Sequence, residues 1–146
     1  MVIAIGADHG GFLYKEYIKS VIKEVEFVDV GAFKLDEADD YTDFSFKAAE
    51  MVASKKADYA LIICRTGVGA AMAMNKVRGI RAGLCETVES CHIARAKNNI
   101  NAITFGADNI CKKRAVRIVR ELIATGFDGG RHKRRIDKIM EYERDH

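Results

Sequence analysis

The chain has 146 residues, of which 49% are hydrophobic and 31% are charged, a composition typical of one soluble globular domain. No apolar stretch is long enough to span a bilayer and no signal-peptide pattern opens the chain, so we expect a cytoplasmic protein that does not bind membranes. The net charge of +3 is too small to indicate nucleic-acid binding, and no aromatic residues are interleaved with the basic C-terminal segment.

Short apolar runs alternate with segments of helical periodicity along the whole chain. In chain order, the expected elements are a strand over 2–7, a helix over 14–22, a strand over 25–30, a helix over 43–54, a strand over 58–63, a helix over 70–76, a strand over 79–84, a helix over 87–97, a strand over 102–105, a helix over 109–125 and a helix over 132–144. The alternation predicts one domain over 1–146, with a Rossmann-like three-layer α/β/α fold and a five-stranded parallel sheet.

The last predicted helix stands apart from this alternation. It follows a glycine-rich break over 126–130, and no strand comes after it. Apolar residues recur along it at Ile136, Ile139 and Met140, which predicts an amphipathic helix. Such an appended helix packs either on its own domain or on a neighbour. Because symmetric dimers are the commonest oligomers, we expect the helix over about 131–145 to pack on a partner subunit.

A glycine-rich loop with a cysteine at its start is the most informative local feature. It runs from Cys64 through Arg65 and Thr66 to Gly67 and Gly69, directly after a buried strand. Ligands of open α/β sheets bind at such strand ends. The glycines allow backbone N–H groups to approach an oxyanion, and a thiol beside them is tuned toward the thiolate. The loop lacks the lysine of a nucleotide-binding P-loop, so it predicts chemistry on an anionic intermediate or a phosphorylated substrate.

Other polar residues lie at predicted strand ends. Asp8 and His9 follow the first strand, where they are either a capping aspartate and a surface histidine or groups that contact a sugar hydroxyl and a phosphate. Asn98 and Asn101 flank the turn into the fifth strand. They are either ordinary turn residues or, if that turn opens on the ligand edge as we expect, amides that stabilise an enediolate.

The basic C-terminal segment holds a possible anion clamp. Arg131 and Arg135 are one helical turn apart, with His132 adjacent, so both guanidinium groups can face one phosphate; the alternative is a solvated helix face. The cysteines form no C-x-x-C pair, which indicates free thiols. Cys85, Cys91 and His92 fit no common zinc module, so we expect no metal and no cofactor.

These ordered motifs together resemble the family of ribose-5-phosphate isomerase B and the galactose-6-phosphate isomerase subunits, nearly from end to end. The residues that carry the resemblance are Gly6-Ala7-Asp8-His9-Gly10-Gly11, Asp40-Tyr41-Thr42-Asp43, Cys64 with Thr66-Gly67-Val68-Gly69, Asn75-Lys76, Gly79-Ile80-Arg81-Ala82, Asn98 with Asn101, and Gly129-Gly130-Arg131-His132 with Arg135.

The resemblance implies a metal-free aldose–ketose isomerase of phosphorylated sugars. It also implies a homodimer, or a dimer of dimers, with sites shared between subunits. By this likeness Cys64 is the base that moves a proton between C1 and C2 through a cis-enediol(ate). The remaining implied roles are an anion hole of Thr66, Gly67, Gly69 and Asn98, sugar contacts from Tyr41 and Asp8, and phosphate contacts from His9, Arg131 and Arg135, some of them across the dimer.

Three positions depart from the family pattern. Lys97 stands where a histidine commonly helps to open the sugar ring, and Asp108 where an arginine often binds phosphate. Arg65 replaces a glycine, and it either compensates for the cation absent at Asp108 or points into solvent. Ring opening is therefore expected to be weak or unnecessary. The alternatives to ribose 5-phosphate are a tetrose phosphate, a six-carbon sugar phosphate as in galactose-6-phosphate isomerase subunits, assembly with a paralogous subunit, or a non-catalytic sugar-phosphate-binding subunit.

Overall fold

The computed structural model describes all 146 residues, and it contains one five-stranded parallel sheet. The strands are β1 (Val2–Ala7), β2 (Glu26–Gly31), β3 (Tyr59–Cys64), β4 (Ala82–Leu84) and β5 (Ala102–Gly106). Their order across the sheet is β2-β1-β3-β5-β4, and every neighbouring pair is parallel. The predicted α/β fold is confirmed.

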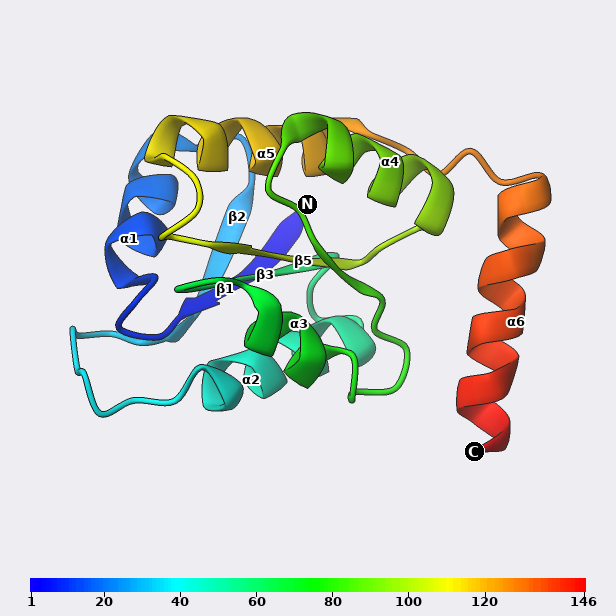
Figure 1. Ribbon diagram of the computed structural model, residues 1–146, viewed down its shortest axis with the longest axis horizontal. Helices are drawn as coiled ribbons and strands as arrows, with labels where there is room; N and C mark the ends of the chain where they lie inside the picture. The colour runs from blue at the N-terminus through cyan, green and yellow to red at the C-terminus, as the bar shows by residue number, and fades with distance from the viewer.

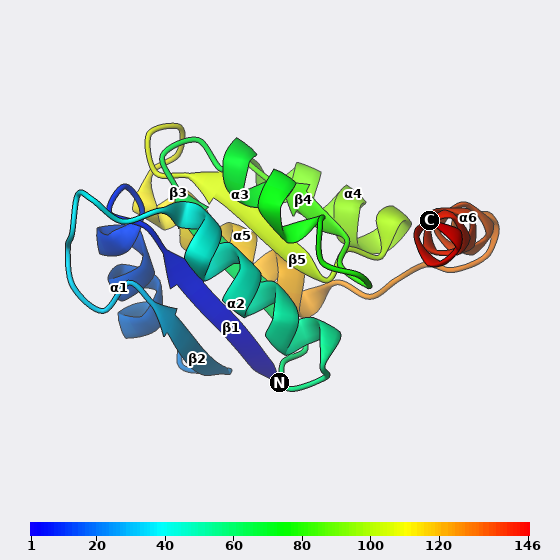
Figure 2. The same cartoon turned by 90° about the horizontal axis from the view of Figure 1, so that it is seen from below.

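Helices cover both faces of the sheet, as Figure 1 shows. One face carries α1 (Phe12–Val21), α4 (Val88–Asn98) and α5 (Lys112–Ala124); the other carries α2 (Tyr41–Ala53) and α3 (Val68–Met74). The sixth helix, α6 (Arg131–Asp145), stands beside this body at the end of an extended segment, and the view from below agrees (Figure 2). No helix combines the length and the apolar character that crossing a membrane requires.

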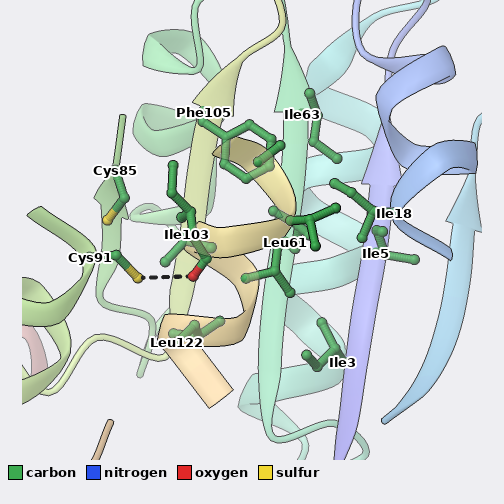
Figure 3. Close-up of a cluster of buried hydrophobic side chains, with 14 of the residues drawn as sticks. Ile3, Ile5, Ile18, Leu61, Ile63, Cys85, Cys91, Ile103, Phe105 and Leu122 are labelled. Carbon is green, nitrogen blue, oxygen red and sulfur yellow. Dashed lines mark hydrogen bonds between the residues drawn. The ribbon is translucent and has the colours of Figure 1, made fainter. Parts of the chain in front are cut away.

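The pleat of the strands divides the core between the two faces. Ile3, Ile5, Leu61, Ile63 and Phe105 are fully buried beneath α1, α4 and α5, in the cluster that Figure 3 shows. The residues that alternate with these along the strands point to the opposite face. They include several alanines and Cys64, and they pack under α2 and α3. Small side chains on that second face allow the two helices to approach the sheet closely. Cys64 therefore faces the α2–α3 side.

Two elements begin three residues later than the sequence prediction, whereas the other boundaries agree to within two residues. The fourth strand covers only Ala82–Leu84 rather than 79–84. Gly79 has a φ of +85°, and the side chain of Asn101 accepts a hydrogen bond from the Arg81 amide (2.8 Å) and donates one to the Gly79 carbonyl (2.8 Å). These contacts hold 79–81 as a loop. Helix α5 begins at Lys112 rather than at 109, because a turn at Asn109 precedes it (its amide donates to Gly106 O, 3.1 Å).

The strand order creates a crevice at one edge of the sheet. After β1 the chain crosses to β2 on one side, whereas after β3 it leads to β4 and β5 on the other side. Ala7 pairs with Ile63 and Cys64 pairs with Gly106, so the loops that follow β1, β3 and β5 leave the sheet at one level. Such a switch point is where open α/β sheets bind their ligands.

Candidate functional site

Cys64 ends β3 at this switch point. Its side chain is 4% exposed, and its sulfur accepts a hydrogen bond from the Gly67 amide (3.1 Å). This hydrogen bond fixes the sulfur at the end of β3, and the thiolate is the form in which a cysteine acts as a base. Cys64 lines none of five surface cavities of about 230 to 620 Å³ on the single chain.

The loop after Cys64 is held in one conformation by its surroundings. Gly67 has a φ of +80°, and a Cβ there would lie 2.9 Å from the Phe105 backbone. The buried hydroxyl of Thr104 donates to Gly67 O at 2.8 Å, a support that local sequence patterns did not reveal. The Gly69 and Ala70 amides donate to no group of the chain. The loop therefore presents two free N–H groups beside a thiol, the arrangement that an oxyanion requires.

Tyr41 covers the same loop from α2. A Cβ at Gly69 would lie 2.4 Å from Tyr41 Cζ and 2.5 Å from its hydroxyl oxygen, so only glycine allows the ring to rest there. The Tyr41 hydroxyl makes no hydrogen bond within the chain and remains accessible to solvent. The structure therefore brings Tyr41, Gly67 and Gly69 together near Cys64.

Asp8 follows β1, next to the end of β3. It is 6% exposed, and its Oδ1 accepts hydrogen bonds from the amides of Gly10 (2.9 Å) and Gly11 (3.2 Å). Burial raises the pKa of Asp8, although these two amides and the neighbouring His9 oppose the rise. One carboxylate oxygen thus shapes the turn, and the other remains available to a ligand.

His9 is paired with a residue that the sequence analysis did not identify. Its Nδ1 lies 2.7 Å from Asp39 Oδ1, and the same oxygen accepts a hydrogen bond from the His9 amide (2.9 Å). The hydrogen bond to Asp39 raises the pKa of His9, and the charge of Asp8 adds to the rise. Asp39 lies in an irregular acidic loop without periodicity, so nothing in the local pattern distinguished it from Asp36 or Asp40.

Arg65 points away from the sulfur. It lines a groove of about 330 Å³ together with His9 and residues of α1 and α5, at the edge of the sheet where β1, β3 and β5 end. Its guanidinium lies 3.5 Å from Asp108 Oδ2, and both side chains are more than half exposed. The cation at 65 and the carboxylate at 108 therefore form a surface ion pair. Arg65 belongs to the wall around His9 rather than to the thiol pocket.

The turn that holds Asn98 is not on the ligand edge, contrary to expectation. Helix α4 begins near the carboxyl end of β4 and runs back across the sheet, so its last residues Lys97 and Asn98 lie where β5 begins. Asn98 lines a cavity of about 230 Å³ there, with Ile136 and Ile139 of α6. Asn101 braces the loop at 79–81 and has a structural role. Within one chain, Asn98 is remote from Cys64.

The predicted anion clamp lies on the same remote side. Arg131 and Arg135 are exposed in the first turns of α6, with His132 partly buried between them. Helix α6 is tied to this edge of the sheet by a hydrogen bond from the Gly79 amide to Glu143 (2.8 Å). Figure 1 shows α6 at the opposite end of the molecule from the loops that follow β1 and β3. The predicted site residues of one chain therefore form two groups at opposite edges of its sheet, which we call the Cys64 half-site and the α6 half-site.

An apolar strip lies between the two half-sites. Val68, Met72 and Leu84 are 50%, 65% and 40% exposed, and with Ala71 and Asn75 they line a groove of about 410 Å³ over α3. Large apolar side chains exposed together mark an interaction surface more often than isolated ones do.

The zinc alternative is not supported by the positions of its residues. Cys85 and Cys91 are fully buried in the core, and the Cys91 thiol donates to the carbonyl of Ile118 (3.5 Å; Figure 3). His92 points outward and pairs with Glu121 (2.7 Å). The three side chains do not converge on one point.

Comparison with known proteins places the chain among sugar-phosphate isomerases. Residues 3–139 match the family model described as Ribose/Galactose Isomerase. A probable ribose-5-phosphate isomerase B of Mycoplasma genitalium is 38% identical over 98% of this chain and 96% of its own length, and ribose-5-phosphate isomerase B of Escherichia coli is 36% identical over 97% and 95%. The crystal structure of the Mycoplasma genitalium enzyme with bound ribulose 5-phosphate superposes with a TM-score of 0.95, at 36% identity over 99% of this chain and 97% of that one.

Proposed function

The chain belongs to the ribose/galactose isomerase family, as an isomerase of the ribose-5-phosphate isomerase B type, and on this premise we propose that Cys64 is the base that interconverts a phosphorylated aldose and its ketose. The observation that carries the proposal is the Gly67 amide aimed at the Cys64 sulfur beside the free amides of Gly69 and Ala70. The relative with bound ribulose 5-phosphate supports a five-carbon substrate.

The reaction follows from this arrangement. The Cys64 thiolate takes the proton from C2 of the open-chain aldose, and the electron pair of that C–H bond moves toward C1, so that negative charge develops on the C1 oxygen. The free amides of the loop donate to this oxygen and stabilise the cis-enediolate. A proton then passes from the C2 hydroxyl to the C1 oxygen, and the thiol returns its proton to C1, which gives the C2 ketone and regenerates the thiolate. Tyr41 and Asp8 contact sugar hydroxyls, and His9 contacts the phosphate.

The phosphate site is completed by a second copy of the chain. Arg131, His132 and Arg135 lie too far from Cys64 to serve it within one chain, because α6 stands at the opposite edge of the sheet. A two-fold dimer brings the α6 half-site of each copy to the Cys64 half-site of the other, and Asn98 with it. The apolar strip of Val68, Met72 and Leu84 lies between the half-sites and forms the contact.

One experiment tests the proposal directly. Aldose phosphates of four, five and six carbons are incubated with the protein in D₂O, and ketose formation and deuterium incorporation are followed by proton NMR. We expect conversion of ribose 5-phosphate, and Cys64→Ala should lower its rate by about 10²- to 10⁴-fold. Cys111→Ala, at an exposed cysteine, is the matched control. Turnover by Cys64→Ala at the wild-type rate would exclude the cysteine as base, and binding without turnover by the wild type would indicate a sugar-phosphate-binding subunit.

A further inference from the structure

The carboxylate of Asp39 is unusual among the polar groups of this chain. Its side chain is 11% exposed, and its Oδ2 is the one buried side-chain oxygen or nitrogen that lacks a hydrogen-bond partner. Buried polar groups in native proteins are almost always satisfied, so an exception requires an explanation. A buried carboxylate without a cation is costly, and no lysine or arginine pairs with Asp39.

His9 supplies the missing positive charge when its ring is protonated. Asp39 Oδ1 accepts a hydrogen bond from the His9 amide (2.9 Å) and lies 2.7 Å from His9 Nδ1. The carboxylate therefore fixes both the backbone and the ring of His9. The other ring nitrogen of His9, Nε2, makes no hydrogen bond within the chain and remains accessible to solvent. The ring therefore presents one N–H donor toward the groove that His9 and Arg65 line.

We propose that Asp39 is a positioning residue that holds His9 as an oriented imidazolium for the phosphate of the substrate. This inference rests on the proposed function, because it assigns the phosphate end of the same site. Asp39 lies in the loop at 32–40, which follows β2, whereas His9 follows β1. A carboxylate of one loop thus favours the protonated form of a histidine in another. Asp39 itself contacts no substrate, and its effect passes through His9.

Other charges around His9 act in both directions. Asp8 favours the protonated ring and Arg65 opposes it, and the groove adds three more charged residues: Glu37, Asp108 and Lys112. Asp39 outweighs these groups because it alone contacts the ring. Removing its charge while keeping its shape should therefore lower the pKa of His9.

The test compares wild type with Asp39→Asn and Asp36→Asn. Asparagine retains an oxygen for the His9 amide, so Asp39→Asn removes the charge and preserves the loop. Asp36 carries the same carboxylate on the same loop, where its Oδ1 accepts only the Ala38 amide (3.0 Å), so Asp36→Asn is the matched control. The His9 ring is titrated by NMR, with its resonances identified by their absence in His9→Gln. We expect its pKa to fall by about one pH unit in Asp39→Asn only.

Kinetics provide the second readout. At high pH the KM of Asp39→Asn for ribose 5-phosphate should rise about tenfold, with kcat within about twofold, and the KM values of the two proteins should converge as the pH falls and His9 becomes protonated in both. A His9 titration that is the same in all three proteins would overturn the inference, and so would a KM ratio that does not depend on pH.

Titration with inorganic phosphate separates this inference from the proposed function. If Asp39→Asn weakens the phosphate-induced shift of the His9 resonances but the wild type forms no ketose, the positioning role stands and the isomerase proposal fails. If the wild type forms ketose but phosphate perturbs His9 equally with and without Asp39, the isomerase proposal stands and the positioning role fails.

Discussion

Individual residues of the site divide into those to which the proposed reaction assigns chemistry and those that hold the loop in place. Cys64, Tyr41 and the loop amides converge on the end of β3, while Thr104 and Gly67 hold the loop in place. The sequence identified the first group because a cysteine before two glycines at a strand end is a recognisable pattern. It missed Thr104 and Asp39, because their partners are 37 and 30 residues away in the chain.

Lys97 leads to a prediction at this scale about ring opening. Its exposed side chain offers an ammonium in place of an imidazole, and an ammonium has no lone pair with which to accept a proton. Lys97→His introduces a group that titrates near neutral pH at the half-site offered to a partner. We expect kcat/KM for ribose 5-phosphate, which is mostly cyclic, to rise about tenfold or more.

The control for this substitution is Lys97→Gln, which removes the ammonium without adding an imidazole. It should leave the rate near that of the wild type. A fall in ribose 5-phosphate turnover in Lys97→His would show that Lys97 is adapted to a different substrate or that ring opening is not limiting.

At the scale of elements, α1 is joined to β2 by a buried ion pair. Lys15 is fully buried in α1 and donates to Asp29 Oδ2 on β2 (2.6 Å), which Lys19 also contacts (2.6 Å). Burial raises the pKa of Asp29, but the hydrogen bonds from Lys15 and Lys19 outweigh it, so the pKa is lowered overall. Asp29→Asn leaves the buried Lys15 ammonium with only the half-exposed Glu16 (2.9 Å) as a counter-charge and should cost up to about 3–5 kcal/mol of unfolding free energy.

The pH dependence of stability follows from the same pair. Because the folded state lowers the pKa of Asp29, its contribution is complete above the unfolded value of about 3.9 and is lost as the pH falls through the folded value. Urea unfolding at pH 7 and at pH 3 measures how much of the unfolding free energy depends on the charged form of Asp29. The wild type should lose more free energy between the two pH values than Asp29→Asn does, and equal losses would contradict the assignment.

The Cys64 loop makes a second prediction at this scale. Gly67→Ala forces a φ of +80° on an alanine and places its Cβ 2.9 Å from the Phe105 backbone, so the loop must shift. We expect a loss of about 2–4 kcal/mol in unfolding free energy, with activity reduced as well. Gly126→Ala, which meets nothing within 4 Å, is the matched control and should be nearly neutral by thermal unfolding.

Strands and helices were predictable from the sequence. The prediction was wrong about one turn, the turn that holds Asn98, which lies at the other edge of the sheet. The alternating pattern identified every strand and helix, because buried parallel strands are apolar throughout and helices repeat every 3.6 residues. The position of β5 between β3 and β4 has no local signal, since it depends on how the helices pack. The expectation for Asn98 was wrong because a helix that follows a parallel strand ends at the opposite edge.

For the molecule as a whole, the separation of the two half-sites is the dominant fact. Only Ile136 of α6 is buried in the chain, so the helix contributes little to the core. A chain that ends at residue 129 should therefore fold, with a far-ultraviolet spectrum reduced only by the missing helix, and have no measurable isomerase activity. Activity near that of the full chain would show that α6 does not belong to the site.

Mixed dimers test most directly the claim that each active site joins Cys64 of one copy to α6 of the other. Cys64→Ala and the double variant Arg131→Ala/Arg135→Ala are each expected to be nearly inactive as homodimers. When the two are co-expressed in equal amounts, half of the dimers are mixed, and one of the two sites in each mixed dimer is intact. The account predicts about a quarter of the wild-type kcat per subunit. An activity no greater than the mean of the two separate variants would contradict it.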